Sequence, residues 1–318
     1  MPRRTRLFVL MIMAITVLWI GAPCVAASQD SYRIINVADD FLAYYQAGQG
    51  KSPDEQAGLW DSMLESKYPD FFQDALYRRK TGADRDRYKQ SCINRFWEEI
   101  SPHMDRIARL NQGAEKRIRT MVAEFQKHLP GFKPQTDFFI TISFSFRGKA
   151  VTVGGRDVMA VGLEFFEDPG SPQFEITLAH ELFHLYHFQF FNAGGGLYRS
   201  LWAEGLATHA SAVVVPGHRF STYLGFPVEK MNQCHDLLPL LAGDLRKHMG
   251  DNDHRLQRLY FGAEPNDTKV PPEAGYYVGL VIMDNLAKTI PLDDMARMPA
   301  KQVFAVLEGE LKRLEQAQ

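Results

Sequence analysis

The chain has 318 residues, enough for one large domain or two small ones. Hydrophobic residues make up 45% of it and charged residues 23%, as in ordinary globular proteins. A formal net charge of −2 provides no general field that would attract nucleic acid or anionic lipid, so we expect no nucleic-acid partner.

The first 27 residues have the three-part layout of a secretory signal peptide. The cationic start MPRRTR precedes the apolar segment LFVLMIMAITVLWI, and small residues follow, with Val25 and Ala27 before the expected cut. The apolar segment is shorter than the roughly 20 residues that a membrane-spanning helix needs. We therefore expect an exported protein, periplasmic or secreted, with no membrane span after leader removal. An uncleaved N-terminal anchor is the alternative.

Removal of the leader leaves two cysteines, Cys92 and Cys234. In an exported protein these two thiols can form a disulfide, and two free buried thiols are the alternative. Their separation in the sequence does not decide between the two.

Residues 28–131 have a helical pattern and form the predicted N-terminal region. Ser52, Pro53 and Glu55 have the spacing of a capping box with proline at the first helical position. A second Ser-Pro start at Ser101 predicts a helix that continues to Pro130.

The amino-acid composition changes between residues 137 and 166, where segments rich in β-branched and aromatic residues are separated by glycine-containing turns. This pattern predicts a small sheet of about three strands. Helices follow to the end of the chain, and the clearest cover about 173–191, 199–214, 275–289 and 299–316. We therefore predict a mostly helical α+β fold in which residues 132–318 form the catalytic domain.

The stretch HELFHLYH, residues 180–187, places three histidines and a glutamate in an otherwise apolar helix. His180 and His184 are four residues apart, so both rings lie on one helix face and can bind one metal ion. Glu181 is the next residue around the helix, where its carboxylate can reach a water on that metal without being a ligand. This is the H-E-x-x-H arrangement of zinc hydrolases.

A third ligand is expected on the next apolar helix, LYRSLWAEGLATHASAVVVPG. Glu204 is its only carboxylate and lies among apolar neighbours, where an ionised side chain is costly unless a positive charge meets it. A metal ion is the natural partner. The alternative is a glutamate at the helix edge that faces water.

This spacing, with Glu204 twenty residues after the second histidine, resembles the gluzincins, the thermolysin-like clan of zinc metallopeptidases. The likeness covers roughly residues 150–290 and is nearest to the predicted zinc proteases of the clan whose substrates are uncharacterised. It implies a sheet before the site helix, one zinc ion in a cleft, and hydrolysis of peptide bonds in a peptide or protein substrate. Manganese or iron could load the same ligands.

Two neighbouring histidines are weaker ligand candidates, and a threonine is a candidate partner for a ligating ring. His187 lies about 10 Å along the helix axis from His180, too far for one zinc ion that also binds His184. His209 lies five residues after Glu204, about 140° around the helix, so both are not expected to reach the metal. Thr208 is one turn after Glu204, where it could hydrogen-bond a ligating ring.

The resemblance also implies a group that stabilises the oxyanion, since many gluzincins use a Tyr or His downstream of the Glu ligand. GYYVG resembles the Gly-Tyr-x-x-Gly of the nearest families, so Tyr276 is the first candidate and Tyr277 the second. Tyr276 is equally consistent with a core tyrosine on an apolar helical stripe.

The strand over residues 157–166 has two implied roles. In the clan, an edge strand of the cleft pairs with an extended peptide through its backbone. The segment VGLEF is also loosely similar to the motif with which the clan's aminopeptidases hold a free N-terminus, which would make Glu164 an amine ligand.

The sequence therefore predicts an exported zinc metallopeptidase. His180, His184 and Glu204 hold the metal, Glu181 acts as general base and Tyr276 stabilises the oxyanion. The rival is a catalytically silent zinc-containing envelope scaffold or binding protein, with the N-terminal hundred residues as a plug over the cleft. A zinc hydrolase that acts on non-peptide substrates is a third alternative.

Overall fold

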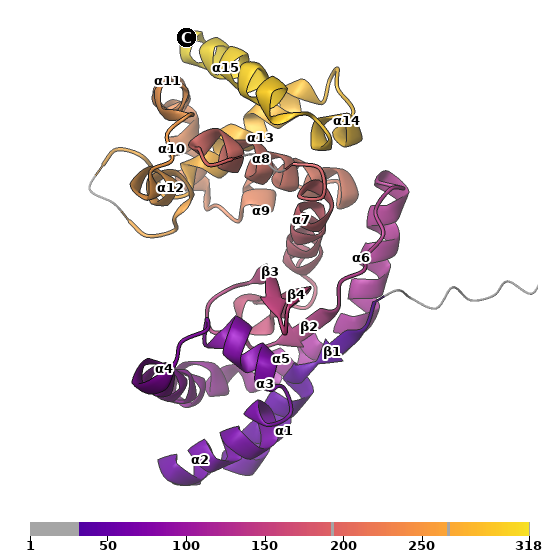
Figure 1. Ribbon diagram of the computed structural model, residues 1–318, viewed down its shortest axis with the longest axis vertical. Coiled ribbons are helices and arrows are strands. Elements are labelled where there is room, and N and C mark those ends of the chain that lie inside the picture. The colour runs from indigo at the N-terminus through magenta and orange to yellow at the C-terminus, as the bar shows by residue number, and fades with distance from the viewer. Residues whose placement is uncertain (1–31, 192–193, 266–267, 318) are drawn as a thin grey trace, which may run out of the picture. The chain divides into compact units, whose positions relative to one another are not determined.

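Helices dominate the computed structural model, which describes residues 32–191, 194–265 and 268–317 (Figure 1). The predicted signal peptide, residues 1–27, lies outside the described residues. One small sheet accompanies the helices. The mostly helical α+β class predicted from the sequence is therefore confirmed.

The N-terminal region is helical apart from one short strand. Its capping box forms as predicted: the Ser52 hydroxyl accepts a hydrogen bond from the Glu55 amide, and the Glu55 carboxylate accepts one from the Ser52 amide. The second, third and fourth helices each continue into a π-helical turn. The helices are α1 (Val37–Gly48), α2 (Pro53–Trp60), α3 (Pro69–Phe71), α4 (Gly82–Arg95), α5 (Met104–Asn111) and α6 (Ala114–His128).

The single helix expected from Ser101 to Pro130 is divided in two. A 3-10 turn at Ser101–His103 leads into α5, and α6 begins only at Ala114. Gly113 has a φ of 87°, a left-handed conformation that glycine adopts without steric cost and that ends a helix.

The sheet has four strands, β1 (Ile34–Asn36), β2 (Phe138–Thr141), β3 (Gly148–Val153) and β4 (Arg156–Gly162), in the order β1-β2-β4-β3. β1 pairs parallel with β2, β2 pairs parallel with β4, and β3 pairs antiparallel with β4. β1 was not predicted, because three residues are too few to show a strand period. The free edge next to the later helices belongs to β3.

The remaining helices are those expected to the end of the chain, and α7 packs against both β3 and α8. Most of α7 is buried, including Phe174, Leu178, Leu182 and Phe183, as its apolar sequence predicts. The helices are α7 (Gln173–His187), α8 (Leu197–Val214), α9 (Phe220–Leu224), α10 (Val228–Asp236), α11 (Leu238–His248), α12 (His254–Phe261), α13 (Ala274–Leu286), α14 (Leu292–Ala296) and α15 (Ala300–Gln316).

Two glycines set the distance between α8 and α13. A Cβ atom on Gly205 would lie 2.8 Å from the Gly279 carbonyl carbon, and a Cβ on Gly279 would lie 2.9 Å from the Gly205 Cα. Because the obstacle on each side is backbone, neither helix can yield by moving a side chain. The two backbones touch directly after Glu204 and one turn beyond Tyr276.

The N-terminal region is joined to the later part of the chain by specific contacts. Arg117 of α6 makes a two-pronged ion pair with Glu175 in the first turn of α7, at 2.6 and 2.8 Å. At the far end of the β3–β4 hairpin, the Gly154 amide donates to the Asp74 carboxylate at 2.9 Å. From Ser31 onward the described residues form one compact unit.

Cys92 and Cys234 are both buried and free, so the disulfide considered from the sequence does not form in this structure. Burial raises the pKa of the Cys92 thiol to about 12 and that of Cys234 to about 11, which keeps both thiols protonated and unreactive. Among the described residues, every helix is too short or too polar to cross a membrane.

Gly279→Ala should destabilise the protein by about 1–3 kcal/mol, because the added methyl group has to separate two helix backbones. Gly309→Ala is the matched control. Gly309 lies inside α15, and a Cβ added there would meet nothing within 4 Å, so its replacement should be neutral or stabilising by up to about 1 kcal/mol. Urea unfolding measures both, and equal stability of the two variants would contradict the glycine contact.

Candidate metal centre

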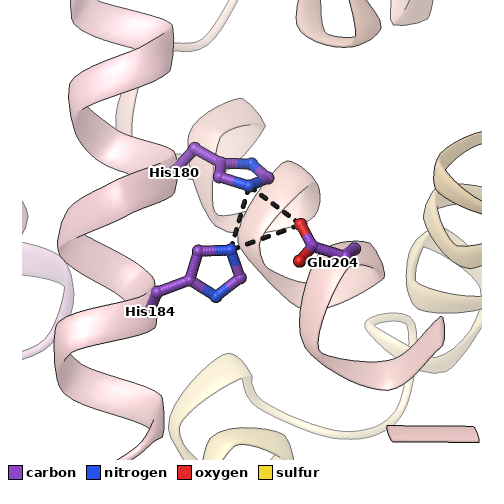
Figure 2. A group of neighbouring side chains, drawn as sticks. All are labelled: His180, His184 and Glu204. Carbon is purple, nitrogen blue, oxygen red and sulfur yellow. Dashed lines mark hydrogen bonds and ion pairs between the residues drawn. The ribbon is translucent and has the colours of Figure 1, made fainter. Parts of the chain in front are cut away.

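Three side chains from two adjacent helices converge on one point. α7 contributes His180 and His184, one turn apart, and α8 contributes Glu204. The His180 Nε2 lies 3.1 Å from the Glu204 Oε2, and the His184 Nε2 lies 3.0 Å from the His180 Nε2 and 3.3 Å from the same Oε2. Figure 2 shows both rings and the carboxylate turned toward one another.

This geometry suits a metal ion. Ligands about 2.0–2.1 Å from a tetrahedral zinc ion lie roughly 3.3 Å from one another, which is close to the observed spacings of 3.0–3.3 Å. Two imidazole nitrogens that face each other at 3.0 Å without a cation can share at most one proton. Among the described residues, this is the one group of three or more His, Cys, Asp or Glu side chains whose ligand atoms meet in this way.

The electrostatics of Glu204 also call for a cation. Burial alone would raise the pKa of its carboxyl group, but the positive charge of His184 and hydrogen bonds from both histidines lower that pKa well below its ordinary value. Burial likewise disfavours the charged form of His184, and the charge of Glu204 outweighs this and raises the His184 pKa. A partly buried carboxylate is thus held ionised by positive charge beside it, a role that a divalent cation can take over.

One of the three ligand candidates, His180, lines a cavity of about 160 Å³. Glu181 lines this cavity together with His180, next to the metal cluster but outside it. The other walls come from the start of β3, the first half of α7, α8, the α9 segment and the start of α13. The lining residues besides these two are Arg147, Gly148, Gln173, Ile176, Thr177, Thr208, Tyr223, Leu224, Phe226, Glu273 and Tyr276.

Gly148 brings the edge strand against the site helix. A Cβ at this position would lie 2.8 Å from the Thr177 Cγ2 and 2.9 Å from the Glu181 Cγ, so a larger residue would push β3 away from α7. The expectation that residues 157–166 form the edge strand is wrong. Those residues form β4, which is paired on both sides, and β3 is the edge strand beside the cavity.

Tyr276, rather than Tyr277, faces the cavity. Burial raises the pKa of the Tyr276 hydroxyl, and so do the nearby negative charges of Glu204, Glu273 and Glu181. Its ring lies 6.5 Å from that of His180. The Tyr277 hydroxyl lies 3.2 Å from the His235 Nδ1, on α10. Of the two tyrosines, therefore, only Tyr276 can present its hydroxyl beside the metal cluster.

Comparison with known proteins agrees with this geometry. Residues 145–305, which are 161 of the 318 residues, match the family described as "Predicted Zn-dependent protease (DUF2268)". The chain belongs to this family. Searches of the curated proteins and of the solved structures found no match. The matched residues of this predicted Zn-dependent protease include β3, α7, α8 and α13, and so the whole lining of the cavity.

His187 and His209 of this family member lie outside the metal cluster, and Thr208 lines the cavity. His187 is fully buried, its ring stacks on Phe191 at 4.7 Å, and burial lowers its pKa to about 3. Burial also lowers the pKa of His209, and the negative charge of Asp284 opposes this shift. The Thr208 hydroxyl donates to the Glu204 backbone carbonyl at 2.8 Å, so the hydrogen bond expected from Thr208 to a ligating ring is replaced by one within its own helix.

Glu164 has a structural environment that differs from an amine-binding site. Its Oε1 accepts hydrogen bonds from the Ser143 and Phe144 amides, at 2.9 and 2.6 Å, and thereby supports Phe144 at a φ of 62°. Part of the side chain reaches the surface, but the Oε2 atom is buried without a partner. Burial raises the Glu164 pKa to about 7, against these hydrogen bonds.

Sequence reasoning missed Arg147, Gly148 and the α9 segment as parts of the site. Arg147 and Gly148 directly precede the expected strand, so a glycine at the start of a strand was the available signal for a close approach. The α9 segment showed only the turn residues Gly225 and Pro227. No local pattern links any of these residues to the site helix, whose His180 lies some 30 to 50 positions away.

Glu164 should make the protein less stable as pH rises from about 4.5 to 8. Its folded pKa of about 7 exceeds the ordinary 4.5, so the folded state binds more protons than the unfolded state in this window, and the stability present below pH 4.5 is lost through pH 7. The full loss is about 3 kcal/mol. Urea unfolding measures the free energy of unfolding of the wild type and of Glu164→Gln. The stability of the wild type relative to that of Glu164→Gln should fall as pH rises from about 4.5 to 8.

Titration of other groups cancels in that difference, because both proteins share them. Glu167→Gln, on an exposed neighbouring side chain, should give a curve parallel to the wild type. A parallel curve for Glu164→Gln as well would show that the Glu164 carboxyl titrates normally.

Proposed function

We propose that this predicted Zn-dependent protease is an active metallopeptidase of the gluzincin type, with one zinc ion held by His180, His184 and Glu204. The observation that carries the proposal is that Glu181 and His180 line one cavity, and that His180 belongs to a complete two-histidine, one-carboxylate ligand set. A purely structural zinc site closes all four positions with protein ligands, whereas a three-ligand set leaves a position for water.

The proposed chemistry divides between the metal and the side chains. When bound, zinc would lower the pKa of a water molecule to about 7 and polarise the substrate carbonyl. Glu181 takes the proton from the attacking water and delivers it to the leaving amine. The Tyr276 hydroxyl donates a hydrogen bond to the carbonyl oxygen as that oxygen gains negative charge.

The edge strand supports a peptide as substrate. β3 has one unpaired edge, and its first residue, Gly148, lines the cavity beside Glu181. An extended peptide can add to such an edge through backbone hydrogen bonds, which give affinity without sequence selectivity. We therefore assign to β3 the role that the sequence assigned to residues 157–166.

The lining of the cavity favours the enzyme over the silent scaffold. All cavity residues fall between Arg147 and Tyr276, and none of the described N-terminal residues before Arg147 contributes to the walls. The proposed plug would have to place such a residue over Glu181. We also retain export as part of the proposal, which rests on the signal-like sequence of residues 1–27, and the N-terminal sequence of the mature protein checks it.

The zinc-loaded protein should cleave unfolded casein, and a chelator should abolish the cleavage. Glu181→Gln should retain one equivalent of zinc, measured by elemental analysis, and lose nearly all turnover, because only the base is removed. Glu98→Gln, on an exposed carboxylate of the N-terminal region, is the matched control and should remain fully active.

Two outcomes would overturn parts of this proposal. A fully active Glu181→Gln variant would refute the assignment of the base. A protein that holds zinc but cleaves neither casein nor short peptides would favour the scaffold.

Tyr276→Phe should lower kcat by about 100-fold and change KM little, because the lost hydrogen bond forms to the oxyanion and not to the ground-state carbonyl. Tyr277→Phe makes the same chemical change on the neighbouring residue, whose hydroxyl contacts His235, and should leave kcat near the wild-type value. Steady-state kinetics on one peptide measures both. Equal kcat values for the two variants would show that Tyr276 contributes to packing and does not stabilise the oxyanion.

A further inference from the structure

Arg147 occupies an unusual position between two cavities. The inner cavity is the one beside the metal cluster, and an outer cavity of about 480 Å³ lies on the far side of Arg147. Arg147, Gln173 and Phe226 line both, so the two cavities adjoin, and together they are called the groove. Arg147 is the one lysine or arginine among the residues that line either cavity.

Most hydrogen-bond donors of the Arg147 guanidinium are available to a ligand. Its Nη1 lies 3.5 Å from the Gln173 Oε1, at the limit of a hydrogen bond, and the group lies 5.9 Å from the centre of the Phe166 ring. None of the ion pairs among the described residues involves Arg147. A guanidinium carries five N–H groups in a planar fork, so at least four remain for a ligand.

The carboxylates of the inner groove do not neutralise this charge. Glu273 is paired with Lys230, whose Nζ lies 2.7 Å from the Glu273 Oε2. Glu181, on the site helix, faces Gly148 of β3, and Glu204 belongs to the metal cluster. Glu167 lines the outer cavity, but among the described residues it forms no ion pair with Arg147. The charge of Arg147 is therefore unpaired in a groove whose other end carries the reacting groups.

From these contacts we infer that Arg147 selects substrates that carry a carboxylate near the cleaved bond, as an acidic side chain or as the C-terminal carboxylate. This inference rests on the proposed peptidase function and names its substrate class. A carboxylate matches the fork of a guanidinium with two parallel hydrogen bonds.

The position of the carboxylate along the substrate follows from α7. Gln173, which contacts Arg147, precedes His180 by seven residues, or about 10 Å along the helix axis. An extended peptide covers about 3.3 Å per residue. The carboxylate bound by Arg147 should therefore lie about three residues from the cleaved bond.

The test uses one scanning series of acetylated alanine hexapeptides with a single phenylalanine. Glu or Gln stands at each other position in turn, and each peptide has a free or an amidated C-terminus. Binding is measured by calorimetry on the zinc-loaded full-length Glu181→Gln protein, so that no peptide is consumed. The same background carries Arg147→Gln, Arg147→Lys or, as matched control, Arg156→Gln, which alters an exposed arginine that lines neither cavity.

We expect the carboxylate peptides to bind about tenfold more tightly than their amide partners. Arg147→Gln should abolish this preference, Arg147→Lys should retain part of it, and Arg156→Gln should leave it intact. A preference for the free C-terminus indicates an exopeptidase, whereas a preference for Glu within amidated peptides indicates an acidic-site endopeptidase. An unchanged preference in Arg147→Gln, or none in the parent protein, would overturn the inference.

Two further measurements separate this inference from its alternatives. In metal-free protein the preference should persist, because it depends on Arg147. A preference that disappears with the metal would mean that the carboxylate binds zinc, and would overturn the inference. Turnover of the same peptides by protein with an intact Glu181 tests the proposed function separately, since an inert protein with an Arg147-dependent preference would refute the peptidase alone.

Discussion

The partly buried charge of Glu204 is the constraint on which the arrangement of the site depends. Its side chain is 23% exposed, and an ionised carboxylate in such a partly buried place is stabilised by positive charge beside it, which the two imidazoles of α7 supply. α7 and α8 must therefore pack in one register, with His180 and His184 facing residue 204. The same requirement makes the cluster a strong site for a divalent cation, since a cation satisfies the carboxylate and both ring nitrogens together.

Glycine contacts determine how close the other functional groups come to this cluster. Gly148 lets β3 reach the side chain of Glu181, and the Gly205–Gly279 contact holds α13 against α8 directly after Glu204. Tyr276 precedes Gly279 by three residues, about one helical turn, so this backbone contact positions the turn of α13 that carries its hydroxyl. Each candidate catalytic group thus lies within one turn of, or in contact with, a position where a side chain larger than hydrogen cannot fit.

The sequence could predict the features of the site that depend on a single helix, but not those that depend on contacts between distant segments. His180, Glu181 and His184 follow from the geometry of a single helix, and Glu204 follows from the cost of burying a charge, so these were accessible without coordinates. β1, the break at Gly113, the edge position of β3 and the role of Arg147 depend on pairing between distant segments. A three-residue strand or a lone arginine carries no periodic signal, and only the tertiary packing gives either a partner. Glu164 shows the converse, where local similarity to a binding motif concealed a carboxylate that supports the Phe144 turn.

The described part of the N-terminal region contacts the sheet and the site helix and lines neither cavity of the groove. It contributes β1 to the sheet, anchors the turn of the β3–β4 hairpin through Asp74, and holds the first turn of α7 through Arg117. These contacts reach the edge strand and the site helix from the ends away from the metal cluster. In the proposed function β3 accepts a peptide, so it has to stay in place while its free edge is unpaired, and the Asp74 contact at the hairpin turn holds it there. The hundred residues before the matched family region therefore fit a role in fixing β3 against α7, at the spacing that Gly148 permits.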